Sequence, residues 1–216
     1  MQDVRTTQRA AAGQVAAGWR TSLEAMRGER AHPVEAGRWL GGPRTLLYAL
    51  GVQQLELKLT AGLAWLLRPD GHHRLGSRVL AGMLTELGVP YEGDELSDAV
   101  VVVEETRLDD AEREMRADLV VYARSWTVVV EAKVHAGEQH EQLERLHSLW
   151  GDDPGPFFVF LTRGRRTPLS AGPGAGDWHN VTWGRIAAIA REATHGRQPA
   201  PGVCDFIETV EVFHHD

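Results

Sequence analysis

Four runs of apolar and β-branched residues between positions 98 and 162 constrain the fold of this 216-residue chain more than any other feature. β-Branched side chains favour extended backbone, so each run predicts a strand. The last run is apolar throughout, which is typical of a sheet buried on both faces. The four predicted strands are Asp98–Thr106, Ala117–Tyr122, Trp126–Val134 and Phe157–Thr162.

Helical periodicity surrounds these strands. Apolar residues recur at near-helical spacing over residues 3–27, 45–67, 75–87 and 138–150, and another helix is expected over 184–193. The order of helices, three strands, helix and strand predicts the α/β class: one central mixed β-sheet flanked by helices, with extra N-terminal helices. A short strand is also expected over 181–183, and residues 205–213 fit either a helix or a strand.

The length of the chain fits a single domain, because domains typically contain roughly 100–200 residues. We therefore expect one domain over residues 1–216. Gly and Pro residues over 28–43 predict a connection after the first helix. It separates an N-terminal helical appendage, 1–44, from a core, 45–165, and residues 166–216 form the C-terminal part.

Composition excludes several classes of protein. Apolar residues make up 43% and charged residues 25%, which is typical of a globular domain. The net charge of −7 excludes a strongly basic nucleic-acid coat, although it leaves room for a local basic groove. The single cysteine, Cys204, forms no internal disulfide and no all-cysteine zinc site. No run of 18 apolar residues and no signal-peptide pattern occurs, so we expect a cytoplasmic protein without membrane contact.

The second and third predicted strands form a hairpin whose register follows from the sequence. Pairing residues outward from a two-residue turn at Arg124 and Ser125 places Asp118 directly opposite Glu131. Facing residues share a sheet face, with Cβ atoms about 4.5–5.5 Å apart. Lys133 lies on the same face as Glu131, because side chains alternate with a period of two. Three charged groups therefore meet at one end of apolar strands.

Two facing carboxylates repel each other unless a cation lies between them. Oxygen ligands favour Mg²⁺ or Mn²⁺, and such an ion promotes phosphodiester hydrolysis by activating a bound water. Lys133 would orient that water and stabilise the charge that grows on the phosphorus centre. Lysine is rare here, with 21 arginines and only two lysines, which favours a special task for Lys133. The alternative is an ordinary cross-strand salt bridge on an exposed face.

Three arginines, Arg163, Arg165 and Arg166, follow the fourth predicted strand. They are candidates for contact with nucleic-acid phosphates, which guanidinium groups bind well. The alternative is a solvated loop with no such contact.

The pattern of Asp118 followed by Glu131-Ala132-Lys133 resembles the signature of the PD-(D/E)XK nuclease superfamily, although Ala117 replaces its proline. Gln142 matches a glutamine found on the next helix of many members. Upstream, Glu56 and the stretch LAWLLRPDGHHRLG resemble a conserved block of one uncharacterised branch, in which His73, Leu75 and Gly76 match. Arg74 and Ser77 depart from that block.

The resemblance implies a restriction-endonuclease-like core, a dependence on Mg²⁺ (or Mn²⁺), and nucleic acid, usually DNA, as substrate. It also implies that Asp118, Glu131 and the Ala132 carbonyl hold the metal. Glu56 would assist as a further ligand or position the water, and Gln142 would support the site. His73 would contact nucleic acid. The alternative is that these three residues have no functional role: Glu56 as a surface glutamate, Gln142 as a residue at the boundary of the core, and His73 as a surface histidine.

Two rival functions remain open at this point. One is a catalytically inactive module of the same fold that binds nucleic acid or a protein partner. The other is a metal-dependent phosphoesterase that acts on small substrates. Defence against foreign DNA and DNA repair are both compatible with a nuclease of this kind, as is a homodimer.

Overall fold

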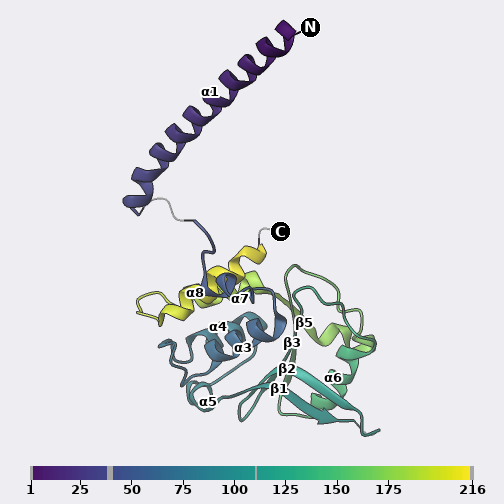
Figure 1. Ribbon diagram of the computed structural model, residues 1–216. Coiled ribbons are helices and arrows are strands. Elements are labelled where there is room, and N and C mark those ends of the chain that lie inside the picture. Colours follow the sequence, from purple (N-terminus) through teal and green to yellow (C-terminus); the bar gives the residue numbers. More distant parts are fainter. Residues whose placement is uncertain (1, 38–40, 110, 215–216) are drawn as a thin grey trace. The chain divides into compact units, whose positions relative to one another are not determined.

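The computed structural model describes residues 2–37, 41–109 and 111–214. The chain divides into two compact units, Met1–Arg44 and Thr45–Asp216. The first unit contains one long helix, α1 (Gln2–Glu35), shown in purple in Figure 1. It extends beyond the predicted end at residue 27 and includes Pro33 in its last turn, where a missing N–H removes only one helical hydrogen bond.

The second unit contains a five-stranded mixed sheet in the order β1-β2-β3-β4-β5. The strands β1 to β3 are antiparallel, whereas β4 runs parallel to β3 and β5 runs parallel to β4. The predicted central mixed sheet is therefore confirmed. The strands are β1 (Val100–Leu108), β2 (Glu114–Tyr122), β3 (Thr127–Ala132), β4 (Pro156–Thr162) and β5 (Trp178–Thr182).

Helices flank both faces of this sheet. They are α2 (Leu46–Ala49), α3 (Glu56–Leu67), α4 (Arg78–Leu87), α5 (Gly93–Asp98), α6 (Gln142–Trp150), α7 (Trp183–Ala193) and α8 (Pro201–Glu211), with short 3₁₀ turns η1 (Gly172–Asp177) and η2 (Val212–His214). The sequence did not predict α5, and it left open whether the last element is the helix α8. Within the described residues, no helix is both long and apolar enough to cross a membrane.

The predicted register of the hairpin is confirmed. The ladder between β2 and β3 pairs Leu119 with Val130 and Tyr122 with Thr127. The Ala123 N–H donates to the Trp126 carbonyl over 2.9 Å and closes the two-residue turn. Continuing this register by one pair places Asp118 opposite Glu131.

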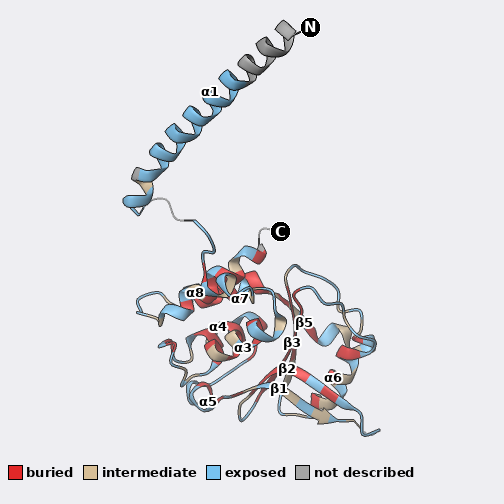
Figure 2. Cartoon of the chain, viewed as in Figure 1, coloured by how far each residue is buried: buried red, intermediate tan, exposed pale blue. Residues whose placement is uncertain are grey.

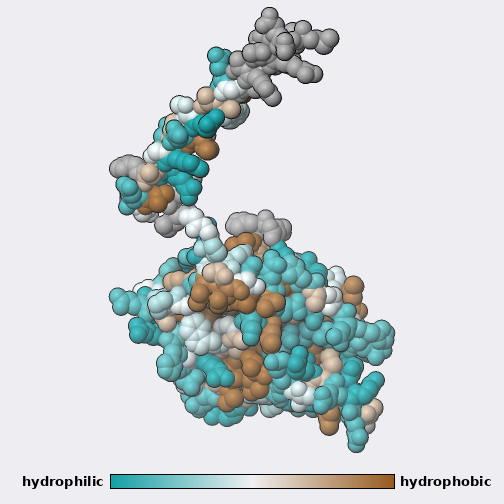
Figure 3. Space-filling model, in the orientation of Figure 1, coloured by the Kyte–Doolittle hydropathy of each residue, from teal (hydrophilic) through white to brown (hydrophobic). Residues whose placement is uncertain are grey.

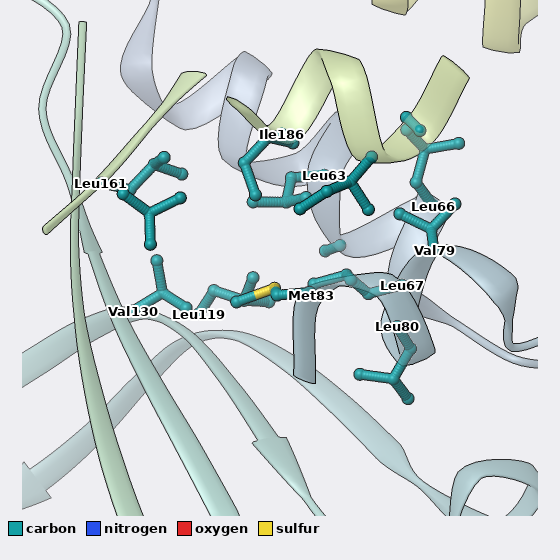
Figure 4. Close-up of a cluster of buried hydrophobic side chains, with 14 of the residues drawn as sticks. Leu63, Leu66, Leu67, Val79, Leu80, Met83, Leu119, Val130, Leu161 and Ile186 are labelled. Atoms are coloured by element: carbon teal, nitrogen blue, oxygen red, sulfur yellow. The ribbon is translucent and has the colours of Figure 1, made fainter. Parts of the chain in front are cut away.

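Two apolar clusters cover the two faces of the sheet. On one face, α3, α4, α7 and α8 pack against the sheet, and Figure 4 shows Leu119, Val130 and Leu161 of three neighbouring strands pointing toward Met83 and Ile186 of the helices. On the other face, α6 packs against the sheet with Trp150 fully buried. The buried residues in Figure 2 follow the strands and the inner sides of these helices, and hydrophilic residues cover most of the visible surface in Figure 3.

Candidate active site

The end of β3 places a charged side chain inside the apolar layer between the sheet and α6. Glu131 is only 1% exposed, and it is next but one to Val129, which belongs to the cluster on the α6 side. Its Oε1 accepts two hydrogen bonds, from Lys133 Nζ over 2.6 Å and from Gln142 Nε2 over 2.7 Å. Gln142 is the first residue of α6 and is 8% exposed. The structure therefore brings three of the predicted site residues together.

Asp118 lies where the alternation of side chains along β2 changes phase. Ala117 packs on the α6 side, whereas Leu119, two residues further, packs on the opposite face. A regular strand would put both on one face. In β1, Glu104 lies between the pairs that flank this point and has a left-handed φ of +53°. The Asp118 carboxylate reaches the end of β3, where its Oδ2 accepts the Ala132 N–H over 2.8 Å.

The two carboxylates disfavour each other's charge. Burial and the nearby Asp118 charge raise the pKa of Glu131 from 4.5 to about 8, although Lys133 opposes this shift. Burial likewise raises the pKa of Asp118, although the Ala132 N–H and Lys133 oppose it. Among the described residues, Glu131 Oε2 is buried and has no hydrogen-bond partner. Because an unpaired buried acceptor is costly, this oxygen is placed to bind a cation.

Glu56 is the first residue of α3, and it binds the loop that follows β3. Its Oε1 accepts the backbone N–H groups of Val134, His135 and Ala136 over 2.8, 3.2 and 3.1 Å. Burial alone would raise the pKa of Glu56, but these three amides lower it by more. Its negative charge raises the pKa of both Asp118 and Glu131, so it lies within electrostatic reach of the site.

Within the described part of the chain, no group of three or more His, Cys, Asp or Glu side chains is arranged to hold a metal ion. A third carboxylate ligand, as expected for Glu56, is therefore not seen, because this side chain turns toward the loop amides. The remaining donors do fit a divalent cation. They are the carboxylates of Asp118 and Glu131 with the Ala132 carbonyl, all of them oxygen ligands, and the unpartnered Glu131 Oε2 is the free acceptor.

One comparison with known proteins covers this part of the chain. A family model described as the PD-(D/E)XK nuclease superfamily matches residues 45–155, just over half of the chain. The chain belongs to the PD-(D/E)XK nuclease superfamily. The matched range includes every residue that meets at the end of β3, from Glu56 to Gln142.

Other comparisons add little to this assignment. No curated protein matches the chain. Among solved structures, the small subunit of the heterodimeric restriction endonuclease R.BspD6I is similar at 13% identity, covering 53% of this chain and 70% of that chain with a TM-score of 0.30. A likeness this distant adds nothing to the PD-(D/E)XK assignment.

The expected nucleic-acid contact of His73 is wrong, because the side chain is buried. His73 is 0% exposed and packs edge-on against the Trp65 ring, with ring centroids 5.5 Å apart. Its Nδ1 accepts the Leu75 N–H over 3.1 Å, so Nε2 carries the proton and donates to the Arg68 carbonyl over 2.8 Å. Both ring nitrogens of His73 are therefore used in hydrogen bonds inside this superfamily member.

The three arginines lie at the same edge of the sheet as the site, because β4 runs parallel to β3. Arg163 Nη1 lies 3.4 Å from His135 Nδ1, and its guanidinium lies over the Phe213 ring. Arg166 donates to the Ala136 carbonyl over 3.4 Å and lies over the Phe160 ring. Arg165 is exposed. Contact of these residues with nucleic acid stays a prediction.

One part of the site had no signal in the sequence. A hollow of about 820 Å³ borders the loop between β3 and α6, lined by residues that include His140, Glu141 and Arg166. Glu138 fixes one wall, because its Oε2 accepts both the N–H and the hydroxyl of Ser170 over 2.7 and 2.8 Å. These partners are 32 residues apart, so only the folded chain of this PD-(D/E)XK protein brings them together.

Proposed function

We propose that this chain is a Mg²⁺-dependent nuclease that hydrolyses the phosphodiester bonds of DNA. One observation carries the proposal. The buried Glu131 has an unpartnered Oε2 beside a second carboxylate, Asp118, and a single ammonium, Lys133. When both carboxylates are ionised, the cluster has more negative charge than Lys133 neutralises, and a divalent cation would stabilise that ionised form.

The residues that would hold this cation are Asp118, Glu131 and the Ala132 carbonyl. Mg²⁺ or Mn²⁺ suits an all-oxygen donor set. When bound, such an ion polarises a phosphoryl oxygen and lowers the pKa of a water molecule that becomes the nucleophile.

Two side chains around Glu131 have separate tasks in this proposal. Lys133 is 7% exposed and its Nζ is held by Glu131 Oε1, so a compact positive charge is fixed where the reacting phosphate must lie. It orients the attacking water and stabilises the charge that develops in the transition state. Gln142 is a positioning residue, because its amide holds the same oxygen and so orients the Glu131 carboxylate.

A polymeric substrate is favoured over a small phosphate ester by the basic loop. Arg163, Arg165 and Arg166 lie along the same sheet edge as Glu131, where neighbouring phosphates of a strand would pass. The inactive module is disfavoured because Asp118, Glu131 and Lys133 meet although nothing in that function requires them. We propose defence against foreign DNA or DNA repair, in the cytoplasm, as the setting. A cut through both strands needs two such sites, which a homodimer would supply.

The proposal is tested by cleavage of duplex, single-stranded and branched DNA with Mg²⁺ or Mn²⁺, and with EDTA. We expect cleavage that EDTA abolishes and that Lys133→Ala strongly reduces. Mononucleotide esters serve as the comparison substrate. Turnover of mononucleotides without cleavage of polymers would favour the phosphoesterase, and inactivity on both would favour the binding module.

Metal binding has its own test, which does not depend on activity. Mg²⁺ or Mn²⁺ should raise the melting temperature of the wild-type protein, because a ligand that binds the folded state stabilises it. Glu131→Gln should abolish this increase. Glu114→Gln is the matched control, since Glu114 is exposed at the start of β2, on the strand that carries Asp118. An equal increase in both variants would place the ion elsewhere.

A further inference from the structure

The parallel strands β3, β4 and β5 end at the same edge of the sheet, so the ends of β4 and β5 lie beside the end of β3 that carries the candidate site. The register pairs Ala132 with Leu161, and Thr162 with Thr182, so the ends of β3, β4 and β5 lie level. Neighbouring strands are about 4.8 Å apart, so the end of β5 lies about 10 Å from the end of β3. That separation corresponds to the axial rise of about three base pairs of B-form DNA at 3.4 Å each.

A second hollow opens at the ends of β4 and β5. Its volume is about 490 Å³, and its lining includes Arg163, Arg165, Thr182 and Arg185. The loop between Thr162 and Arg166 is fixed at both ends. The Thr162 hydroxyl donates to the Gly164 carbonyl over 2.8 Å, and Asn180 Nδ2 donates to the Arg166 carbonyl over 2.5 Å.

Among the described residues that line this hollow, basic side chains outnumber acidic ones. Glu86 is the one acidic residue among those described in the lining. Its Oε2 accepts hydrogen bonds from Arg185 Nε and Nη2 over 2.9 and 2.7 Å. That pair is neutral, and among the other basic residues of the lining Arg165 is the one whose charge the proposal uses. Arg165 is exposed, and its side chain makes no hydrogen bond or ion pair with any other residue that the structure describes. Its charge still reaches the Glu86 carboxylate on the far wall.

We propose that this hollow holds a backbone phosphate of the nucleic-acid strand that is cut at Glu131 and Lys133, with Arg165 as the residue that contacts it. The inference rests on the proposed nuclease function and deepens it, because it assigns a second anchoring point on the substrate. A phosphate held beside the end of β5, which lies about 10 Å from the end of β3 along the sheet edge, would fix the position and direction of the strand.

The test measures binding of a labelled oligonucleotide to the Lys133→Ala protein, which we expect to bind without cutting. Arg165→Gln in this background should weaken binding about five- to tenfold and lower the slope of log K against log salt by about one, because one phosphate contact is lost. Arg165→Glu should weaken binding further by repulsion. A mononucleotide at the same phosphate concentration should not displace the oligonucleotide.

Arg197→Gln is the matched control. Arg197 is also exposed, but it lies beyond the C-terminal end of α7, whereas the hollow lies at the start of that helix. This variant removes the same charge and should change neither affinity nor slope. Melting temperatures of all variants should equal that of the parent protein, because both side chains are exposed.

Two failures are distinguishable. If the wild-type protein cleaves DNA but Arg165→Gln binds like Arg197→Gln, the phosphate site is overturned and the nuclease function stands. If the parent protein binds no oligonucleotide and the wild type cleaves none, the proposed function fails and this inference fails with it. Equal displacement by the mononucleotide would also overturn the assignment to a polymer.

Discussion

Gln142, the first residue of α6, donates its side-chain amide hydrogen over 2.7 Å to Glu131, the penultimate residue of β3. The accepting oxygen, Oε1, also receives the Lys133 ammonium. Both donors therefore meet at one carboxylate oxygen, and Oε2 is left without a partner among the described residues. This asymmetry orients the carboxylate and keeps one oxygen available for a cation.

Lys133 should be irreplaceable by arginine. Its compact ammonium fits beside Glu131 Oε1 with only 7% of the residue exposed, and the larger planar guanidinium cannot take the same position. Removing one such transition-state donor typically costs about 10²–10³ in rate. We expect Lys133→Ala and Lys133→Arg to lose cleavage to that extent while DNA binding stays within a few-fold. Lys58→Arg, an exposed change of the same kind, is the control and should cleave normally.

The pH dependence of stability should reveal the raised pKa of Glu131. In the folded protein this carboxyl keeps its proton up to about pH 8, whereas an ordinary glutamate loses it near 4.5. The folded state therefore binds more protons at Glu131 between these values, so the contribution of Glu131 to stability is full below 4.5 and is lost as the pH rises to about 8. Asp118 acts in the same direction. Melting curves of the metal-free protein measure this decrease.

Glu131→Gln should flatten that profile, because the amide does not titrate. Added Mg²⁺ should also flatten it in the wild-type protein, since a cation stabilises the ionised carboxylates. Without metal, the melting temperature of the wild-type protein should decrease between about pH 5 and 8. A melting temperature that stays constant or increases over this range would contradict the raised pKa of Glu131.

Glu56 should control the order of the loop after β3. Glu56→Ala removes the acceptor of three backbone N–H groups and should destabilise the fold by about 1–3 kcal/mol. Hydrogen exchange at residues 134–136 should become faster in this variant. Because the carboxylate has a lowered pKa, its contribution is present above the ordinary value and is lost as the pH falls through the folded one. Unchanged exchange in that loop would refute this role.

His73 should matter for folding and not for substrate binding. His73→Ala leaves the Leu75 N–H and the Arg68 carbonyl without partners in a buried place, and should cost about 2–3 kcal/mol in chemical denaturation. His72→Ala is the matched control, because His72 is the exposed neighbour. DNA affinity measured well below the melting temperature should be equal in the two variants. A specific loss of affinity in His73→Ala would restore the original expectation.

The pairing of β2 with β3 follows from the local sequence pattern, and this pairing brings together the centre of the candidate site. A period of two and a two-residue turn leave one register for the hairpin, because a slip by one residue would turn every apolar side chain to the wrong face. That register placed Asp118, Glu131 and Lys133 at one strand end, and the structure pairs the strands accordingly. Local periodicity was sufficient for the pairing, although it did not indicate the change of phase at Asp118.

The surroundings of that centre depend on contacts between residues far apart in the chain. The loop amides that bind Glu56 are about 80 residues away in the chain, and the burial of His73 depends on Trp65 and on the backbone at Arg68 and Leu75. No local pattern marks such partners, because a polar side chain looks the same in sequence whether it lies in water or in a packed core. The packing of the helices on the sheet sets which polar groups face each other. It therefore sets which acceptors have hydrogen-bond donors and leaves Glu131 Oε2 without one among the described residues.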